Sequence, residues 1–175
     1  MRALYQNERM AIDLLRRLGL MIILVVVQAL LLNRIHLFGC ATPLLYVYFV
    51  LLFPASMPRW LSLPLAFVLG IAIDSFTNTP GVASFSLTLT AFAQSYLLRL
   101  YLDKDDNEDL SPSIHTMGWL KYFSYAFCLT LLFCLTYFSV EAFSFYHWLH
   151  WLMSTLGSWV LTLILILTLN STRNS

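Results

Sequence analysis

Charged residues divide this chain into long stretches that hold almost no charge. Between Arg17 and Arg34 there is no Asp, Glu, Lys or Arg, and between Arg59 and Arg99 the only one is Asp74. An ionised side chain costs about 2.5 to 3.5 kcal/mol at the centre of a bilayer, so such stretches are typical of membrane spans. Charged residues make up 11% of the chain and hydrophobic residues 59%, against about 25% and roughly 45 to 50% in soluble domains. The sequence therefore excludes a soluble globular protein and predicts an all-α integral membrane protein.

The number of spans follows from the length of these stretches. A membrane-spanning helix needs about 20 predominantly apolar residues, and six segments come near that length. We expect spans at about 14–32, 42–57, 60–76, 82–100, 118–140 and 148–169. The second of these is short and is flanked by prolines. The expected fold is a compact bundle of six transmembrane helices that forms a single polytopic membrane domain over residues 1–175.

The basic residues indicate the orientation of the spans, because Lys and Arg collect in cytoplasmic loops. With six spans, nine of the 10 basic residues fall on one face and only Arg34 falls on the other. Five spans would move Arg173 to the opposite face, and would require fusing segments separated by the turn at 78–81 or by the stretch around Glu141. We therefore expect both termini in the cytoplasm. The nine residues are Arg2, Arg9, Arg16, Arg17, Arg59, Arg99, Lys104, Lys121 and Arg173.

One connection is long enough to carry a site of its own. This loop, at 101–117, is expected in the cytoplasm and contains an acidic cluster at 103–109. The cluster could bind a divalent cation or a basic partner, but it lacks the residue spacing of an EF-hand. We interpret it as a solvated loop. The net charge of the chain is only +1, so no strong electrostatic field attracts nucleic acid.

Asp74 is the most informative single residue, because it is the only acid embedded within an expected span. An intramembrane carboxylate is a functional-site hypothesis by default. Gly70, one turn earlier on the same helix face, would let another helix approach closely. The structural alternative is that Asp74 caps or hydrogen-bonds the following turn, near enough to the interface to stay hydrated. Its expected partners there are Ser75, Thr77, Asn78 or Thr79. The two interpretations are compatible.

The segment after Asp74 predicts a tight turn between two antiparallel spans. Asn78, Thr79, Pro80 and Gly81 follow the span directly. Proline and then glycine suit the two central positions of a type II turn, and the residue before a proline disfavours a continuing helix. Gly70, Asp74, Asn78, Pro80 and Gly81 are therefore the candidate residues for partner binding or for structural support.

No combination of residues predicts catalysis. His147 and His150 lie one turn apart, a spacing that a metal site can use, but they lack a third ligand and stand among aromatic residues typical of a membrane interface. The sequence contains no nucleophile with a neighbouring base and no glycine-rich phosphate loop. We expect no enzyme activity, no metal site and no cofactor.

The span count and the stretch from Gly70 to Gly81 resemble MreD, the rod shape-determining membrane protein of bacteria. In that family the third span ends in a glycine-x-x-x-aspartate step that is followed by a short polar turn with a late glycine. Gly70, Asp74 and Gly81 carry this pattern, and the form Phe-x-Asn-x-Pro-Gly resembles the variant of Bacteroidetes-type bacteria. The close match covers about a tenth of the chain, and the rest agrees only in span count and orientation.

The resemblance implies a non-enzymatic membrane scaffold of the elongasome, the complex that directs peptidoglycan synthesis along the side wall. Its partner would be an MreC-like single-span protein, which links it indirectly to MreB filaments, RodA and a class B penicillin-binding protein. The resemblance also implies residence in the bacterial inner membrane, among membrane lipids. Small residues in the spans would permit close packing against the partner's helix.

The alternative is a substrate-binding S component of an energy-coupling-factor vitamin transporter, a compact six-helix membrane protein whose fold is similar to that of the MreD family. S components typically dock through an Ala-x-x-x-Ala-type face on the first span, which is missing here. A vitamin site would also need several convergent polar groups near the outer loops. Arg34, Asp74, Asn78 and Glu141 would supply a few of these groups.

Overall fold

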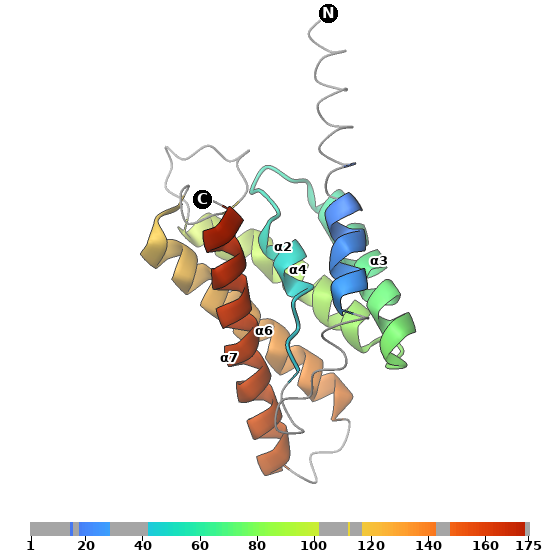
Figure 1. Cartoon of the computed structure of the whole chain (residues 1–175). Coiled ribbons are helices and arrows are strands. Elements are labelled where there is room, and N and C mark those ends of the chain that lie inside the picture. The colour runs from blue at the N-terminus through green and yellow to red at the C-terminus, as the bar shows by residue number, and fades with distance from the viewer. Residues whose placement is uncertain are drawn as a thin grey trace, which may run out of the picture.

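The structure is a computed structural model that describes residues 15, 18–28, 42–101, 112, 117–142 and 148–173. All regular secondary structure in these ranges is helical (Figure 1). Three helical segments are long and apolar enough to cross a membrane, at Arg59–Thr77, Trp119–Glu141 and Trp151–Thr172. The prediction of an all-α membrane protein agrees with this architecture.

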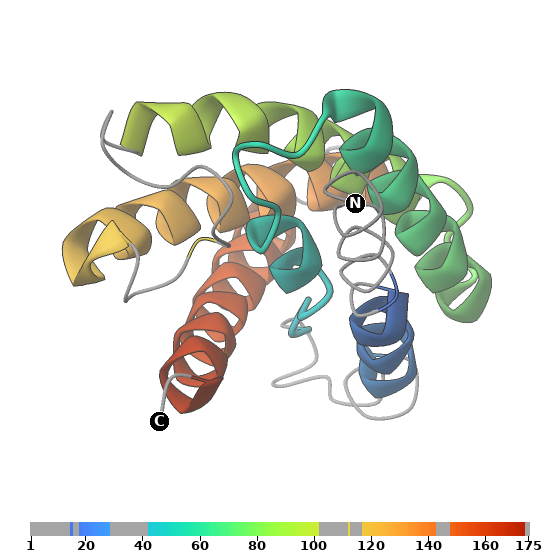
Figure 2. The same cartoon turned by 90° about the horizontal axis from the view of Figure 1, so that it is seen from above.

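The long helices follow one another as antiparallel neighbours. α3 packs along α4, α4 packs on α6, and α6 packs on α7. The short helix α2 contacts α3, α4 and α6, and seen from above it lies inside the ring of long helices (Figure 2). The helices are Leu18–Gln28, α2 (Val47–Leu51), α3 (Arg59–Thr77), α4 (Val82–Tyr101), α6 (Trp119–Glu141) and α7 (Trp148–Arg173).

The four long helices coincide closely with the last four expected spans. The helix Leu18–Gln28 lies inside the expected first span, whose remaining residues lie mostly outside the described part of the chain. The expected acidic loop at 101–117 also falls largely outside the described residues, as do Arg34 and His147. α4 is as long as α3, but its Ser, Thr and Gln residues make it less apolar.

The expected second span at 42–57 is not a continuous helix. Only α2 is helical, and the chain on both sides of it has irregular backbone although residues 43–54 are all buried. Pro43 and Pro54 lie at the two ends of this buried stretch, where proline cannot donate a backbone hydrogen bond. Irregular backbone at membrane depth requires that protein groups satisfy its polar atoms. The segment therefore runs through the bundle as irregular backbone on both sides of α2 (Figure 1), and we refer to it as the broken crossing of the bundle.

Side chains from two helices form hydrogen bonds with the backbone N–H and C=O groups of the residues before α2. The amide of Gln28 donates to the carbonyl of Pro43 at 3.0 Å and accepts from the N–H of Leu45 at 3.1 Å. On the opposite side, the hydroxyl of Thr162 in α7 accepts from the N–H of Leu44 at 3.0 Å. The hydroxyl of Ser158, one turn earlier, accepts from Thr42 at 3.0 Å.

Side chains from two other helices form hydrogen bonds with backbone carbonyls at the end of α2 and just after it. Gln94 of α4 donates from its amide to the carbonyl of Phe53 at 2.9 Å. Tyr125 of α6 donates from its hydroxyl to the carbonyl of Leu51 at 3.3 Å. Both side chains are buried. Four surrounding helices thus contribute side chains that bond the backbone of residues 42–53 on both sides of α2.

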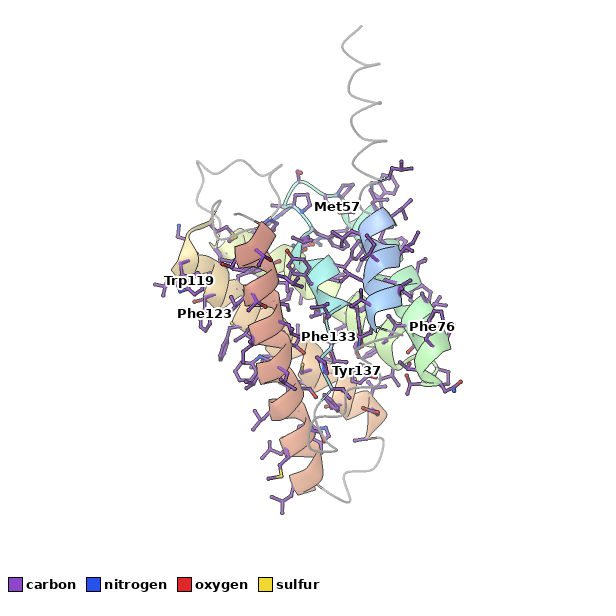
Figure 3. All side chains as sticks on the ribbon, in the orientation of Figure 1. Met57, Phe76, Trp119, Phe123, Phe133 and Tyr137 are labelled. Carbon is purple, nitrogen blue, oxygen red and sulfur yellow. The ribbon has the colours of Figure 1, made fainter. Side chains whose placement is uncertain are left out.

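Side chains are distributed as expected for a protein surrounded by lipid rather than water. Large apolar residues such as Phe76 and Trp119 are more than half exposed, at 61% and 57%. Figure 3 shows these two at the outer edges of the bundle and Phe133 and Tyr137 near its middle. Hydroxyl and amide side chains of α4 and α7 are buried instead, namely Ser84, Ser86, Thr90, Gln94, Ser154, Thr155, Ser158, Thr162 and Asn170. Exposed apolar surface of this extent marks contact with a membrane or a partner.

Candidate functional site

The candidate site begins where α3 ends. Asn78, directly after Thr77, has φ 55° and ψ 30°, a left-handed conformation that Asn adopts more readily than most residues and that stops helices. Gly81 has φ 88°, and the N–H of Val82 donates to the carbonyl of Thr79 at 3.3 Å. This is the geometry of a type II turn with Pro80 and Gly81 at its centre, as the sequence predicts.

The carboxylate of Asp74 accepts four hydrogen bonds, one from Gly81 in the turn and three from the first turn of α4. Its Oδ1 accepts from the N–H of Ala83 at 2.8 Å. Its Oδ2 accepts from the N–H groups of Gly81 at 3.1 Å and Ser84 at 3.0 Å. The hydroxyl of Ser84 donates to the same oxygen at 2.5 Å. Asp74 is only 7% exposed, so these bonds replace the water that an ionised carboxylate would otherwise need.

This arrangement is a helix cap supplied by a different helix. The carbonyl of Gly81 accepts the first helical bond of α4, from Phe85 at 3.0 Å, which makes Gly81 the N-cap residue. An N-cap side chain normally accepts from the second and third N–H groups of its helix, here Ala83 and Ser84, but glycine has no side chain. Asp74 performs this role, and its negative charge also interacts favourably with the positive end of the α4 dipole.

The structural alternative for Asp74 is therefore present in the fold, with different partners from those expected. Among the polar residues of the turn, Ser75 donates to the carbonyl of Ile71 at 2.8 Å. Thr77 donates to Ile73 at 3.0 Å and pairs with the hydroxyl of Thr79 at 2.6 Å. The carboxylate of Asp74 instead bonds Gly81 at the end of the turn and Ala83 and Ser84 in the helix that follows.

Gly70 permits the crossing of α3 and α4. A Cβ added to Gly70 would lie 2.3 Å from the Cα of Ser84 and 2.7 Å from its backbone nitrogen, closer than two such atoms can approach. The helix that Gly70 admits is therefore α4 of the same chain. This close crossing brings the first turn of α4 within reach of Asp74, one turn further along α3.

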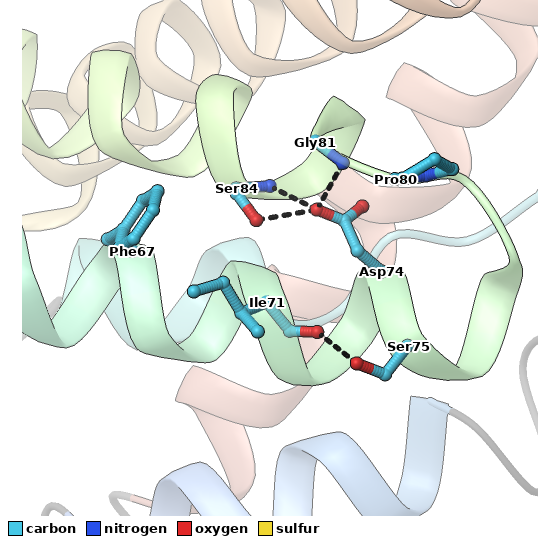
Figure 4. A pocket seen from close by; sticks show the side chains of 7 residues that line it. All are labelled: Phe67, Ile71, Asp74, Ser75, Pro80, Gly81 and Ser84. Atoms are coloured by element: carbon cyan, nitrogen blue, oxygen red, sulfur yellow. Dashed lines mark hydrogen bonds between the residues drawn. The ribbon is translucent and has the colours of Figure 1, made fainter.

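A groove of about 340 Å³ opens on the surface beside this crossing. Figure 4 shows Asp74 at the level of the crossing, with Phe67 and Ile71 on α3 and Ser84 on α4. Phe67 and Ile71 are each 47% exposed and form apolar walls, and the buried, hydrogen-bonded pair of Asp74 and Ser84 lies beneath them. The lining residues are Phe67, Ile71, Asp74, Ser75, Pro80, Gly81 and Ser84. Three of the five candidate residues thus meet at one groove, namely Asp74, Pro80 and Gly81.

The remaining candidates lie away from the groove. Gly70 is buried beneath α4 and Asn78 ends α3, and neither lines the groove. Glu141 is the last residue of α6 and is exposed. The side chain of His150 lies outside the described part of the structure.

Five buried polar residues that hold the broken crossing carry no motif in the sequence. These are Gln28, Gln94, Tyr125, Ser158 and Thr162. A glutamine inside an otherwise apolar helix was the available signal, because an amide placed there needs hydrogen-bond partners. Serine and threonine give no comparable signal, since they bond their own helix backbone as readily.

Comparisons with known proteins give no match to a family model, to a curated protein or to a solved structure.

Proposed function

We propose that this chain is a non-enzymatic membrane scaffold of the MreD type, which binds an MreC-like single-span protein and supports side-wall peptidoglycan synthesis. In this proposal it resides in the bacterial inner membrane with both termini in the cytoplasm. Its contacts with MreB filaments, RodA and a class B penicillin-binding protein are indirect. The sequence pattern Gly70, Asp74 and Gly81 supports the family, and the groove beside Asp74 supports the binding role.

The groove suits a membrane-embedded helix better than it suits a lipid chain. Phe67 and Ile71 offer apolar walls of the kind into which a helix packs. Ser75 is exposed at the edge, and Asp74 and Ser84 form the floor. The exposed hydroxyl oxygen of Ser75 can accept a hydrogen bond from a polar group of a partner helix, which an acyl chain cannot offer.

The groove is also preformed. The four hydrogen bonds of Asp74 join the end of α3 to the start of α4. Gly70 fixes how closely the two helices cross. A rigid concave surface loses little entropy when a partner binds, and this favours a permanent scaffold contact.

The proposed topology counts the broken segment as the second of six crossings. Residues 43–54 are buried throughout and hydrogen-bonded on two sides by Gln28 and Thr162, as required of non-helical backbone in a bilayer. With this crossing included, the helix Leu18–Gln28, α3, α4, α6 and α7 complete six passes.

The first test is affinity capture of the tagged full-length chain from its own cells in detergent, followed by mass spectrometry. Enrichment of an MreC-like single-span protein together with RodA and a penicillin-binding protein would support the proposal. Recovery of paired ATPases with a coupling membrane protein would overturn it and indicate a vitamin-uptake subunit.

A pair of substitutions tests whether the groove is the contact. Ile71→Trp fills the groove from its wall, whereas Val68→Trp adds the same bulk to α3 at a residue that is 50% exposed and does not line the groove. We expect Ile71→Trp to lose the partner and Val68→Trp to keep it. Equal capture by both variants would place the contact elsewhere.

A further inference from the structure

A fixed arginine lies at the opposite end of the α3–α4 pair from Asp74. Arg59 is the first residue of α3, and its guanidinium donates to the hydroxyl of Tyr96 on α4 at 3.1 Å. The guanidinium carbon also lies 4.5 Å from the centre of the Tyr96 ring and 6.0 Å from that of Phe92. A cation over aromatic rings at these distances is attracted by their electron-rich faces. Tyr96 thus holds the charge in place without neutralising it.

No carboxylate pairs with Arg59 in the described residues, and its side chain is exposed. A guanidinium has five N–H donors, and the bond to Tyr96 uses one of them. The remaining N–H groups of the planar guanidinium can donate two parallel hydrogen bonds to the oxygens of one phosphate. A second basic residue, Arg99, is exposed on α4 one turn beyond Tyr96, which adds positive charge to the same end of the hairpin.

The neighbouring side chains are those of a membrane boundary. Trp60 is 75% exposed, Tyr96 is 51% exposed and Leu100 is 78% exposed. Tryptophan and tyrosine are enriched at the level of the lipid headgroups, where the ring is apolar and one edge is polar. The site therefore combines N–H groups that can donate to a phosphate with exposed apolar side chains that can contact the part of an acyl chain nearest the headgroup.

We infer that Arg59, positioned by Tyr96 and assisted by Arg99, binds the phosphate headgroup of an anionic phospholipid at this end of the α3–α4 hairpin. The charge of the site is complementary to such a headgroup, and its exposed aromatic residues place it at the required depth. This inference is independent of the proposed scaffold role and of the direction in which the chain is inserted.

The test measures lipid retention by the purified full-length chain. Native mass spectrometry in detergent would count phosphatidylglycerol and phosphatidylcholine molecules bound after identical titrations. The wild-type chain should prefer phosphatidylglycerol, and Arg59→Gln should weaken its binding roughly fivefold, the effect of about one arginine near an anionic surface. Phosphatidylcholine binding should not change.

Arg173→Gln is the matched control, because it removes one positive charge from the last residue of α7. Figure 1 places this end of α7 at the same end of the bundle as the end of α4. An equal loss of phosphatidylglycerol in both variants would overturn the inference, since it would reflect net charge alone. Unchanged binding by Arg59→Gln would overturn it too.

Tyr96→Leu tests the positioning role at an exposed residue, where substitution does not disturb the core. It removes both the hydroxyl and the ring while leaving every charge in place. We expect weaker phosphatidylglycerol binding with an unchanged thermal unfolding midpoint. If Tyr96→Leu binds as the wild type does, Tyr96 does not position Arg59 and the inference fails.

Discussion

Asp74 performs for α4 the capping that Gly81, as the N-cap residue, cannot perform. The carboxylate lies on α3 and accepts from the N–H groups of Ala83 and Ser84 at 2.8 and 3.0 Å. The turn between the two helices is thereby free to use glycine at φ 88°. The cost is that one side chain on α3 becomes necessary for the start of α4.

Removing the carboxylate should therefore destabilise the fold. Asp74→Ala leaves buried N–H groups of α4 without acceptors, and each such group costs roughly 1 to 3 kcal/mol. We expect a clearly lower unfolding midpoint in detergent and lower abundance in cells. Asp74→Asn keeps the shape and one acceptor oxygen, so its midpoint should lie between those of Asp74→Ala and the wild type. Wild-type stability of Asp74→Ala would contradict the capping role.

Gly70→Ala should also be destabilising, for a steric reason. Its new Cβ would lie 2.3 Å from the Cα of Ser84, so α3 and α4 must move apart, at a cost of about 1 to 3 kcal/mol. Gly19→Ala is the control, because nothing lies within 4 Å of the added Cβ and alanine favours a helix. Thermal unfolding of the two variants should shift in opposite directions, and similar shifts would exclude a specific clash.

Thr162→Val tests the side-chain hydrogen bonds that hold the broken crossing. The hydroxyl of Thr162 accepts from Leu44 at 3.0 Å, and valine would leave that buried N–H unpaired, at roughly 1 to 3 kcal/mol. Thr155→Val removes a buried hydroxyl that donates to the backbone carbonyl of Trp151, one turn earlier on α7, at 2.7 Å. Because the carbonyl of Trp151 also accepts a backbone hydrogen bond within α7, losing the hydroxyl leaves no buried group unpaired. We therefore expect little change in the unfolding midpoint of Thr155→Val. Equal unfolding midpoints for the two variants would contradict the prediction.

Gln94→Met should loosen the other end of the broken crossing. Methionine has a similar shape to glutamine but no donor for the carbonyl of Phe53, which Gln94 reaches at 2.9 Å. We expect faster amide hydrogen exchange in residues 51–58 and a lower unfolding midpoint. Ser95→Ala, at the next and only half-buried residue, should leave both measurements unchanged. If residues 51–58 of Gln94→Met exchange their amide hydrogens as slowly as in the wild type, the side-chain amide of Gln94 is not needed to hold this segment.

The positions of α3, α4, α6 and α7 could be predicted from sequence because charge is a local property with a large cost in a bilayer. The turn at Pro80 and Gly81 was predictable for a similar reason, since both residues restrict their own backbone. Asp74 was identifiable as the embedded acid. Its partners were not, because they depend on how closely α4 crosses Gly70.

The broken crossing at 42–58 could not be predicted with the same tools. Its apolar composition is that of a span, and its prolines mark only the ends of the buried stretch. The backbone is irregular because Gln28 and Thr162 supply hydrogen bonds from helices that are distant in sequence. Such long-range contacts leave no periodic pattern, so sequence gives a length for this segment but no conformation.

The same hydrogen bonds can form only late in the synthesis of the chain. Thr42 and Leu44 leave the ribosome long before Ser158 and Thr162, which accept their N–H groups 116 and 118 residues later. Until the last helix enters the membrane, this stretch has no partner on that side and must remain hydrated or adopt another conformation. A chain truncated after α6 would therefore be an incompletely folded substrate for membrane quality-control proteases, even though each of its earlier long helices is already formed.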